Sequence, residues 1–197
     1  MDKDSITDLI LSILKNSHTS DYIGEGVTQL EHVILAANEA KNNNEENDII
    51  ISALLHDIGH QLVKNPLEKM LDNDGNCLGI VSHENVGADF LKLHNFNDTV
   101  VSYVRNHVAI KRYLCYKDKN YFNNLSESSK QTLLQQNGIM TEEEAKCYEN
   151  INKDYLENMI KVRKYDDLGK DKNKLIGLDI FSELEKYRDL IRLCINN

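Results

Sequence analysis

Residues that favour turns are scarce in this sequence, with one proline and nine glycines among 197 residues. Few positions therefore demand turn geometry, and the abundant Leu, Ile, Glu and Lys suit the interior of helices. No stretch rich in Pro, Gly or Ser divides the chain. We expect an all-α fold in a single domain over residues 1–197, which is long enough to bury one core.

Positive charge and long apolar runs are also in short supply. The chain has 23 Lys and Arg against 32 Asp and Glu, a formal net charge of −9. An acidic chain repels polyphosphate backbones, so we expect no nucleic-acid partner. No apolar run approaches the ~20 residues that a membrane span needs, and the opening M-D-K-D-S-I-T-D has no apolar signal core. We therefore expect a soluble, cytoplasmic protein without a membrane partner.

The four cysteines are widely separated and form no C-x-x-C pair. This spacing argues against a zinc knuckle and against a thioredoxin-type site. We expect reduced thiols without a functional role.

Apolar residues recur at helical spacing through most of the chain. The stretches predicted to be helical are 6–15, 28–41, 49–60, 82–93, 97–113, 155–168 and 179–193. Further helices are predicted to begin at Ser126 and at a capping box formed by Thr141 and Glu144. Segment 61–80 contains D-N-D-G-N and is predicted to be a surface turn, because the acidic residue that closes a calcium loop is missing.

The stretch 49–60, I-I-I-S-A-L-L-H-D-I-G-H, starts as an apolar run and ends in His56, Asp57 and His60. A helix of this kind delivers polar side chains into an interior, where they need a partner such as a metal ion. His56 and Asp57 point about 100° apart on a helix, so both reach one metal only near a helix end or from two sides of the ion. Asp57 can also bridge two metals through its two oxygens. In the alternative interpretation, Asp57 ends the helix and His56 complements its dipole.

Other histidines lie on or beside apolar helix faces. His32, taken alone, is more often a hydrogen-bonded interior histidine than a ligand. His83 begins a helix, where it is accessible, and His107 lies one turn beyond Val104. Lys111 shares a face with His107, so it points toward the same pocket if His107 binds a metal.

Two further pairs allow a structural and a functional interpretation. Tyr22 and Glu25 lie in a glycine-flanked loop that forms either a lid or a simple helix-entry turn. Arg163 and Asp166 are one helical turn apart and either pair with each other or bind an anion and a metal in a pocket. The helix start at Ser126 can cap its own backbone or receive an anion.

The order His32, His56-Asp57, His83, His107, Asp166 resembles the HD-domain superfamily, whose minimal signature is H…HD…D. The full set resembles the branch in which the HD aspartate bridges two metals. The segments Y-I-G-E-x-x-x-Q-L-E-H, H-D-x-G-H, S-H-E-x-x-G-A-D-F-L and H-V-A-x-K-R-Y-L are similar to the di-iron phosphonate dioxygenases of that superfamily. The resemblance covers a core of about 21–170, weakens in 61–80, and leaves 179–193 as a C-terminal packing helix.

The resemblance implies a mixed-valent Fe(II)/Fe(III) pair with O2 as co-substrate. One iron would be held by His32, His56, Asp57 and Asp166, and the other by His83, His107 and the bridging Asp57. Tyr22 would occupy an iron site until substrate arrives, and Glu25 would meet the substrate's amino group. The phosphonate would be surrounded by His60, Lys111, Ser126 and Arg163.

The implied reaction cleaves the carbon–phosphorus bond of a 2-amino-1-hydroxyethylphosphonate-type substrate to phosphate and glycine, or glycine betaine from the trimethylammonium analogue. The residues themselves support this, because nitrogen and oxygen ligands without thiolate suit iron, manganese or zinc. A cavity with Lys111 at one end and Glu25 at the other suits a zwitterionic aminophosphonate.

Two other functions use the same residues. An HD-type phosphohydrolase would activate water with its metals to attack a small phosphate ester, with no task for Tyr22 or Glu25. A non-catalytic ligand sensor or scaffold would keep the metals as structural ions.

Overall fold

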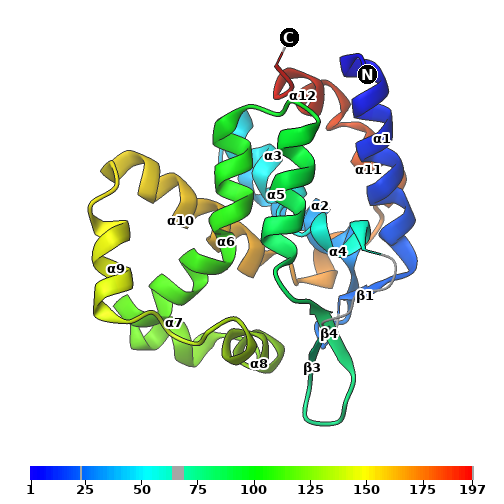
Figure 1. Cartoon of the computed structure of the whole chain (residues 1–197). Coiled ribbons are helices and arrows are strands. Elements are labelled where there is room, and N and C mark those ends of the chain that lie inside the picture. Colours follow the sequence, from blue (N-terminus) through cyan, green and yellow to red (C-terminus); the bar gives the residue numbers. More distant parts are fainter. Residues whose placement is uncertain (23, 64–68, 197) are drawn as a thin grey trace.

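The computed structural model describes residues 1–22, 24–63 and 69–196, and helices form most of this part of the chain (Figure 1). The α-helices are α1 (Lys3–Asn16), α2 (Gln29–Asn42), α3 (Asn47–Leu55), α4 (Gly59–Leu62), α5 (His83–Leu93), α6 (Asp98–Lys117), α7 (Lys119–Asn124), α8 (Glu127–Gln135), α9 (Glu142–Glu149), α10 (Lys153–Leu168), α11 (Ile180–Glu185) and α12 (Arg188–Leu193). Two 3₁₀ turns, η1 (Ser17–Thr19) and η2 (Lys172–Leu175), join them. The all-α fold predicted from composition is confirmed.

Two small antiparallel hairpins complete the described structure. β1 (Asp21–Tyr22) pairs with β2 (Val27–Thr28), and β3 (Lys69–Leu71) pairs with β4 (Cys77–Ile80). The second hairpin projects from the helical body at the bottom of Figure 1. Its D-N-D-G turn is exposed, as expected, but the strands beside it were not predicted. Pro66, also in this segment, lies outside the described residues.

The hydrophobic core forms around α3. Every side chain from Ile49 to Leu55 is buried, because α2, α6 and α10 all pack against this helix. α5 packs in turn against α6 and closes that side of the bundle (Figure 1). A helix that is apolar on all sides belongs in such a central position, and the HD segment therefore ends deep inside the molecule.

The predicted helix 49–60 is interrupted at the point where the predicted metal ligands begin. α3 ends at Leu55, and a new turn, α4, begins at Gly59. Gly59 allows a close approach of α4 to α5, since a Cβ there would lie 2.0 Å from the backbone oxygen of His83. His56 and Ile58 keep right-handed helical dihedrals, but the backbone hydrogen bonds tighten to the i→i−3 type, from Ile58 N to Leu55 O and from His60 N to Asp57 O.

The predicted helix 179–193 is also two helices. α11 and α12 are separated at Tyr187, whose buried ring directs its hydroxyl to Asn38 Oδ1 at 2.6 Å. Tyr187 is the N-cap of α12, and periodicity alone does not reveal this division. The cysteines are free thiols, as predicted.

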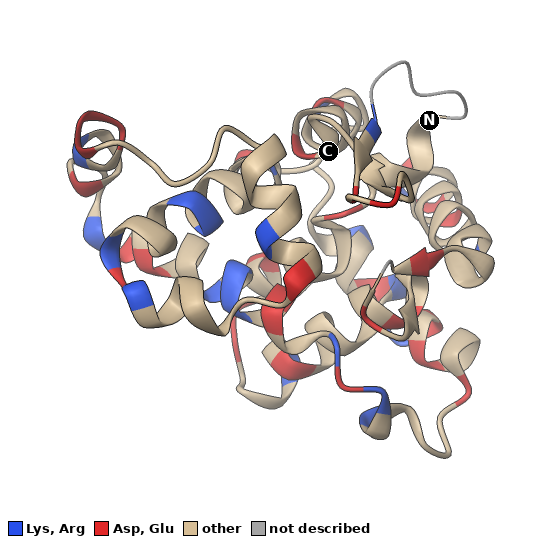
Figure 2. Cartoon of the chain, turned by 90° about the horizontal axis from the view of Figure 1, so that it is seen from below, with Lys and Arg blue, Asp and Glu red and all other residues tan. Residues whose placement is uncertain are grey.

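Acidic and basic residues are interspersed along the helices in the view of Figure 2. None of the helices in the described part of the chain is long and apolar enough to cross a membrane.

Candidate metal centre

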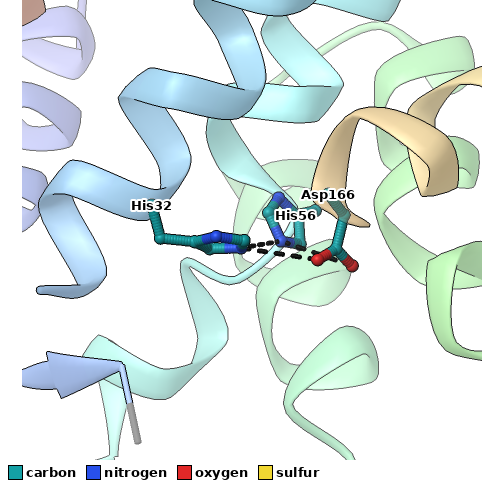
Figure 3. A group of neighbouring side chains, drawn as sticks. All are labelled: His32, His56 and Asp166. Carbon is teal, nitrogen blue, oxygen red and sulfur yellow. Dashed lines mark hydrogen bonds and ion pairs between the residues drawn. The ribbon is translucent and has the colours of Figure 1, made fainter. Parts of the chain in front are cut away.

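The six ligands expected from the sequence converge from five helical elements. They form two buried triads, in each of which the nitrogen and oxygen atoms lie within 4.8 Å of one another. The first triad is His32, His56 and Asp166, and the second is Asp57, His83 and His107. Figure 3 shows the first triad, whose side chains point toward one another from α2, the end of α3 and α10.

Asp57 belongs to the second triad and also reaches the first. Its Oδ2 faces the first triad, 3.4 Å from His56 Nε2 and 3.7 Å from His32 Nε2. Its Oδ1 faces the second triad, 3.2 Å from His83 Nε2 and 3.6 Å from His107 Nε2. Each oxygen of one carboxylate thus faces a different histidine pair, which is the arrangement that a bridging ligand requires.

The four histidines of the triads share one tautomer. Each Nδ1 donates to a backbone carbonyl, which for the four rings is Gly169 at 2.9 Å, Ala53 at 2.9 Å, Ile80 at 3.2 Å and Val104 at 2.7 Å. A neutral ring with its proton on Nδ1 presents a lone pair on Nε2. This carbonyl contact orients histidine as a metal ligand in many proteins.

These lone pairs face each other at short range. His32 Nε2 lies 3.1 Å from His56 Nε2, and His83 Nε2 lies 3.1 Å from His107 Nε2. Two acceptors at that distance repel each other unless a proton or a metal ion lies between them. The buried Oδ1 of Asp166 also has no hydrogen-bond partner among the described residues. The donor set therefore fits a metal ion in each triad, with nitrogen and oxygen ligands suited to iron, manganese or zinc.

The charges in the site favour a cation. Burial lowers the pKa of His56, but the carboxylates of Asp57 and Asp166 outweigh it and raise that pKa to about 9. The second triad has one carboxylate, and burial together with His83 holds the pKa of His107 well below its usual value. The negative potential that would protonate His56 equally attracts a metal ion.

His60 differs from the other four histidines of the site. Its Nδ1 accepts a hydrogen bond from the backbone N–H of Ile80 at 3.1 Å, and its ring stacks on His83. Burial and His83 lower the pKa of His60 to about 3, so the ring is neutral and carries its proton on Nε2. His60 therefore presents an N–H donor rather than a ligand lone pair, as its expected role beside an anion requires.

A cavity of about 60 Å³ adjoins the second triad. Side chains of both triads line it, as do Tyr22, Glu25, His60, Lys111 and Arg163 from the predicted substrate set. Ser126 does not appear among its described lining residues, whereas Ser128, Ser129 and Thr132 of the same helix do. The volume is well below the roughly 300–1,000 Å³ of pockets for drug-sized ligands, so a very small molecule fits best.

Lys111 brings a buried ammonium group to this cavity. Its ammonium donates a 3.1 Å hydrogen bond to Thr132 Oγ1, the one partner it has within 1–22, 24–63 and 69–196. Burial and the nearby Arg163 lower the pKa of Lys111 to about 7. An ammonium group with unused donors and a depressed pKa gains from an incoming anion.

Arg163 is more fully engaged than Lys111. Its guanidinium pairs with Asp166 and with Asp167, and its Nε donates to Tyr121 Oη at 3.0 Å. The pairing alternative weighed from the sequence therefore occurs, and it occurs inside the pocket. Arg163 holds the Asp166 carboxylate in place while one edge of its side chain lines the cavity.

Tyr22 and Gly169 enclose the first triad. The Tyr22 ring is stacked on His32, with ring centroids 3.9 Å apart and planes within 9°. Gly169 follows α10 and leaves no room for a side chain, because a Cβ there would lie 2.8 Å from His32 O and 2.9 Å from His32 Nδ1.

Glu25 has partners that sequence reasoning did not anticipate. Its Oε1 accepts hydrogen bonds from Ser126 Oγ at 2.5 Å and from Lys170 Nζ at 2.9 Å. Lys170 was missed because no helical periodicity or ligand motif includes it. Its position directly after Gly169, at the end of the ligand-bearing helix, was the one available signal.

A helical bundle that buries two histidine–aspartate triads around a shared aspartate defines the class of this protein. The HD domain matches residues 22–146, more than half of the chain, and the chain belongs to the HD-domain family. Asp166 lies beyond the matched segment and completes the site from α10.

Three similar proteins cover nearly the whole chain. An uncharacterized protein of Acanthamoeba polyphaga mimivirus is 41% identical over 92% of this chain and 78% of its own length. The [1-hydroxy-2-(trimethylamino)ethyl]phosphonate dioxygenase (glycine-betaine-forming) of Leisingera caerulea is 37% identical over 86% of this chain and 83% of its own. The hydroxymethylphosphonate dioxygenase of Gimesia maris is 34% identical over 93% of this chain and 86% of its own. The expected resemblance to HD-type phosphonate dioxygenases is confirmed.

Proposed function

We propose that this protein is a di-iron dioxygenase that cleaves the carbon–phosphorus bond of a small 1-hydroxyphosphonate. The observation that carries the proposal is Asp57, whose two oxygens face two separate histidine pairs beside a cavity that contains a buried ammonium group. The names of the Leisingera and Gimesia relatives support the same reaction class.

The reaction balances without an external reductant. For hydroxymethylphosphonate, the dianion and O2 yield formate, hydrogen phosphate and one proton. One C–H bond and the C–P bond break, a carbon–oxygen and a phosphorus–oxygen bond form, and the substrate supplies the four electrons that reduce O2. When bound, the irons supply the redox chemistry that activates O2.

The residues of the chain bind and orient the substrate. Lys111 offers its ammonium group to the phosphonate, because its one hydrogen-bond partner among the described residues is the Thr132 hydroxyl and none of them pairs a carboxylate with it. His60 adds an Nε2–H donor from the wall next to His83. Arg163 holds Asp166 toward the first triad through its ion pair.

Tyr22 controls access to the first triad. Its ring covers His32, and it belongs to a hairpin whose turn contains Gly24 and Gly26 at φ 78° and 72°. These glycines permit backbone conformations that other residues rarely adopt. We propose that Tyr22 would help to hold the metal of the first triad at rest and would move away when substrate enters, so that the site would open to O2 only with substrate present.

The hydroxyl and phosphonate groups are common to the aminophosphonate expected from the sequence and to the substrates named for both dioxygenase relatives. Whether the substrate also carries an amino group depends on Glu25, which was expected to bind it.

The test is anaerobic purification, loading with Fe(II), and incubation with hydroxymethylphosphonate, 1-hydroxyethylphosphonate and 2-amino-1-hydroxyethylphosphonate, with and without O2. We expect phosphate release that needs O2 and consumes it in equal amount. Partly oxidised protein should show the electron paramagnetic resonance signal of a coupled mixed-valent pair. Phosphate release from phosphate esters without O2 would replace the proposal with a phosphohydrolase, and metal binding without any turnover would indicate a sensor.

A further inference from the structure

Lys170 lies beside the candidate metal centre because the preceding residue, Gly169, contacts His32 through its backbone. It follows Gly169, whose carbonyl oxygen accepts the Nδ1–H of His32 at 2.9 Å. The Lys170 ammonium lies 5.9 Å from the centre of the Tyr22 ring, which itself covers His32. Lys170 is thus placed by the same turn that orients a metal ligand.

The ammonium group of Lys170 has a complete set of acceptors. Its Nζ lies 2.9 Å from Glu25 Oε1, 3.0 Å from Ser129 Oγ and 3.3 Å from Ser126 Oγ. A lysine ammonium has three N–H donors, so these three acceptors match it in number. The Lys170 and Glu25 side chains are only 16% and 10% exposed, so water screens this pair little.

The ion pair with Lys170 makes the Glu25 carboxylate at the cavity wall less available to a substrate ammonium group. Glu25 lines the cavity, but its negative charge is already balanced by an ammonium group of the protein. A substrate ammonium would have to displace Lys170 or lie beside a like charge, and like charges in a poorly hydrated site disfavour binding. A substrate without a cationic group neither displaces Lys170 nor is repelled by its charge.

We propose that Lys170 is a specificity-determining residue: it acts as a built-in ammonium group that satisfies Glu25, so the cavity selects 1-hydroxyphosphonates without a cationic substituent. This inference rests on the proposed function and narrows its substrate class. It replaces the expected contact between Glu25 and a substrate amine. Of the substrates named for the two dioxygenase relatives, hydroxymethylphosphonate is the one without an ammonium group, and it also suits the small cavity.

Binding measured without O2 tests selectivity separately from turnover. The iron-loaded protein is titrated anaerobically by calorimetry with hydroxymethylphosphonate, 1-hydroxyethylphosphonate and 2-amino-1-hydroxyethylphosphonate. We expect the two substrates without an ammonium group to bind at least about tenfold more tightly than the amino compound. The 1-hydroxyethyl compound has the same carbon chain as the amino compound and lacks only its ammonium group.

Lys170→Met should leave Glu25 free for a substrate ammonium and shift the binding ratio toward the amino compound by at least about tenfold. Lys164→Met is the matched control, because Lys164 is an exposed lysine of α10, the helix that ends just before Lys170, and its loss should leave the ratio unchanged. The double variant Glu25→Gln/Lys170→Met removes both charges and should show no gain for the amino compound.

Three results would overturn the inference: tighter binding of the amino compound to the unaltered protein, an unchanged ratio in Lys170→Met, or an equal gain in the double variant. The first of these decides the matter even if Lys170→Met does not fold. Failure of the proposed function is a different result, namely no oxygen-dependent phosphate release from any of the compounds while binding selectivity persists.

Discussion

Two lysines near the same cavity are in opposite situations. Lys111 is buried with a single hydroxyl partner among the described residues, and its pKa is lowered to about 7 by burial and by Arg163. Lys170 has three acceptors, one of which is a carboxylate. The partners of a charged residue thus decide whether it can bind a ligand. The Lys111 ammonium can bind an anionic substrate group, whereas the Lys170 ammonium already balances the Glu25 carboxylate, which then needs no substrate cation.

The largest loss of activity is expected from a change in the metal centre itself, because substrate bound at Lys111 reacts only beside an intact centre. Asp57→Ala removes an oxygen from each triad, so we expect loss of both metals and a fall in activity of at least about 100-fold. Metal content is measured by elemental analysis after iron loading and desalting. His18→Ala is the control, since His18 is an exposed histidine away from the triads and should keep full metal content. Two metals retained in Asp57→Ala would contradict the bridging role.

Removing the available cation should weaken substrate binding next. Lys111→Met loses a charge-assisted contact of about 1.5–3 kcal/mol, which corresponds to a rise in KM of roughly 10–100-fold. Lys111→Arg keeps the charge and should lose less. Oxygen-dependent phosphate release measures both variants, with Lys164→Met as the exposed-lysine control. Equal KM values for Lys111→Met and the unaltered protein would show that the anion binds elsewhere.

The completed pair at Glu25 and Lys170 should matter for stability. Glu25→Gln or Lys170→Met leaves a mostly buried charge without its partner, and the double variant removes both charges. We expect a coupling free energy of about 1–2 kcal/mol from urea unfolding of the four proteins. Additive single effects would mean that the pair contributes only as two independent side chains.

The smallest effect is on the stability of the metal-free protein, which is lowered because the Lys111 ammonium is buried without a carboxylate partner among the described residues. Between pH about 7 and 10.5 the unfolded chain holds the Lys111 proton while the folded protein releases it, so stability rises with pH through this range. The destabilisation is complete below pH 7 and fades toward pH 10.5. Lys111→Met should therefore raise the Tm by about 3 °C at pH 6 and by less at pH 10. A gain independent of pH would assign the change to packing rather than to charge.

Much of the site could be predicted because its ligands follow local rules. His107 and Lys111 share a helix face by their spacing, and His56-Asp57 ends an apolar run that belongs in a core. The break between α3 and α4 was not predicted, and the close approach of Gly59 to the backbone of His83, in another helix, cannot be read from the local sequence. The division of the last helix at Tyr187 was not predicted either, nor was the hydrogen bond of Tyr187 to the distant Asn38.

The helical class followed from the sequence, because periodicity is a local property, and the order of histidines and aspartates along the chain pointed to the six side chains that meet in the interior. Helix packing set which oxygen of Asp57 faces which histidine pair and which nitrogen each histidine presents. It also decided that Glu25 is balanced by Lys170, 145 residues away in the chain. Such pairings depend on how helices pack, because packing sets the distances and exposure on which hydrogen bonds and charge interactions depend.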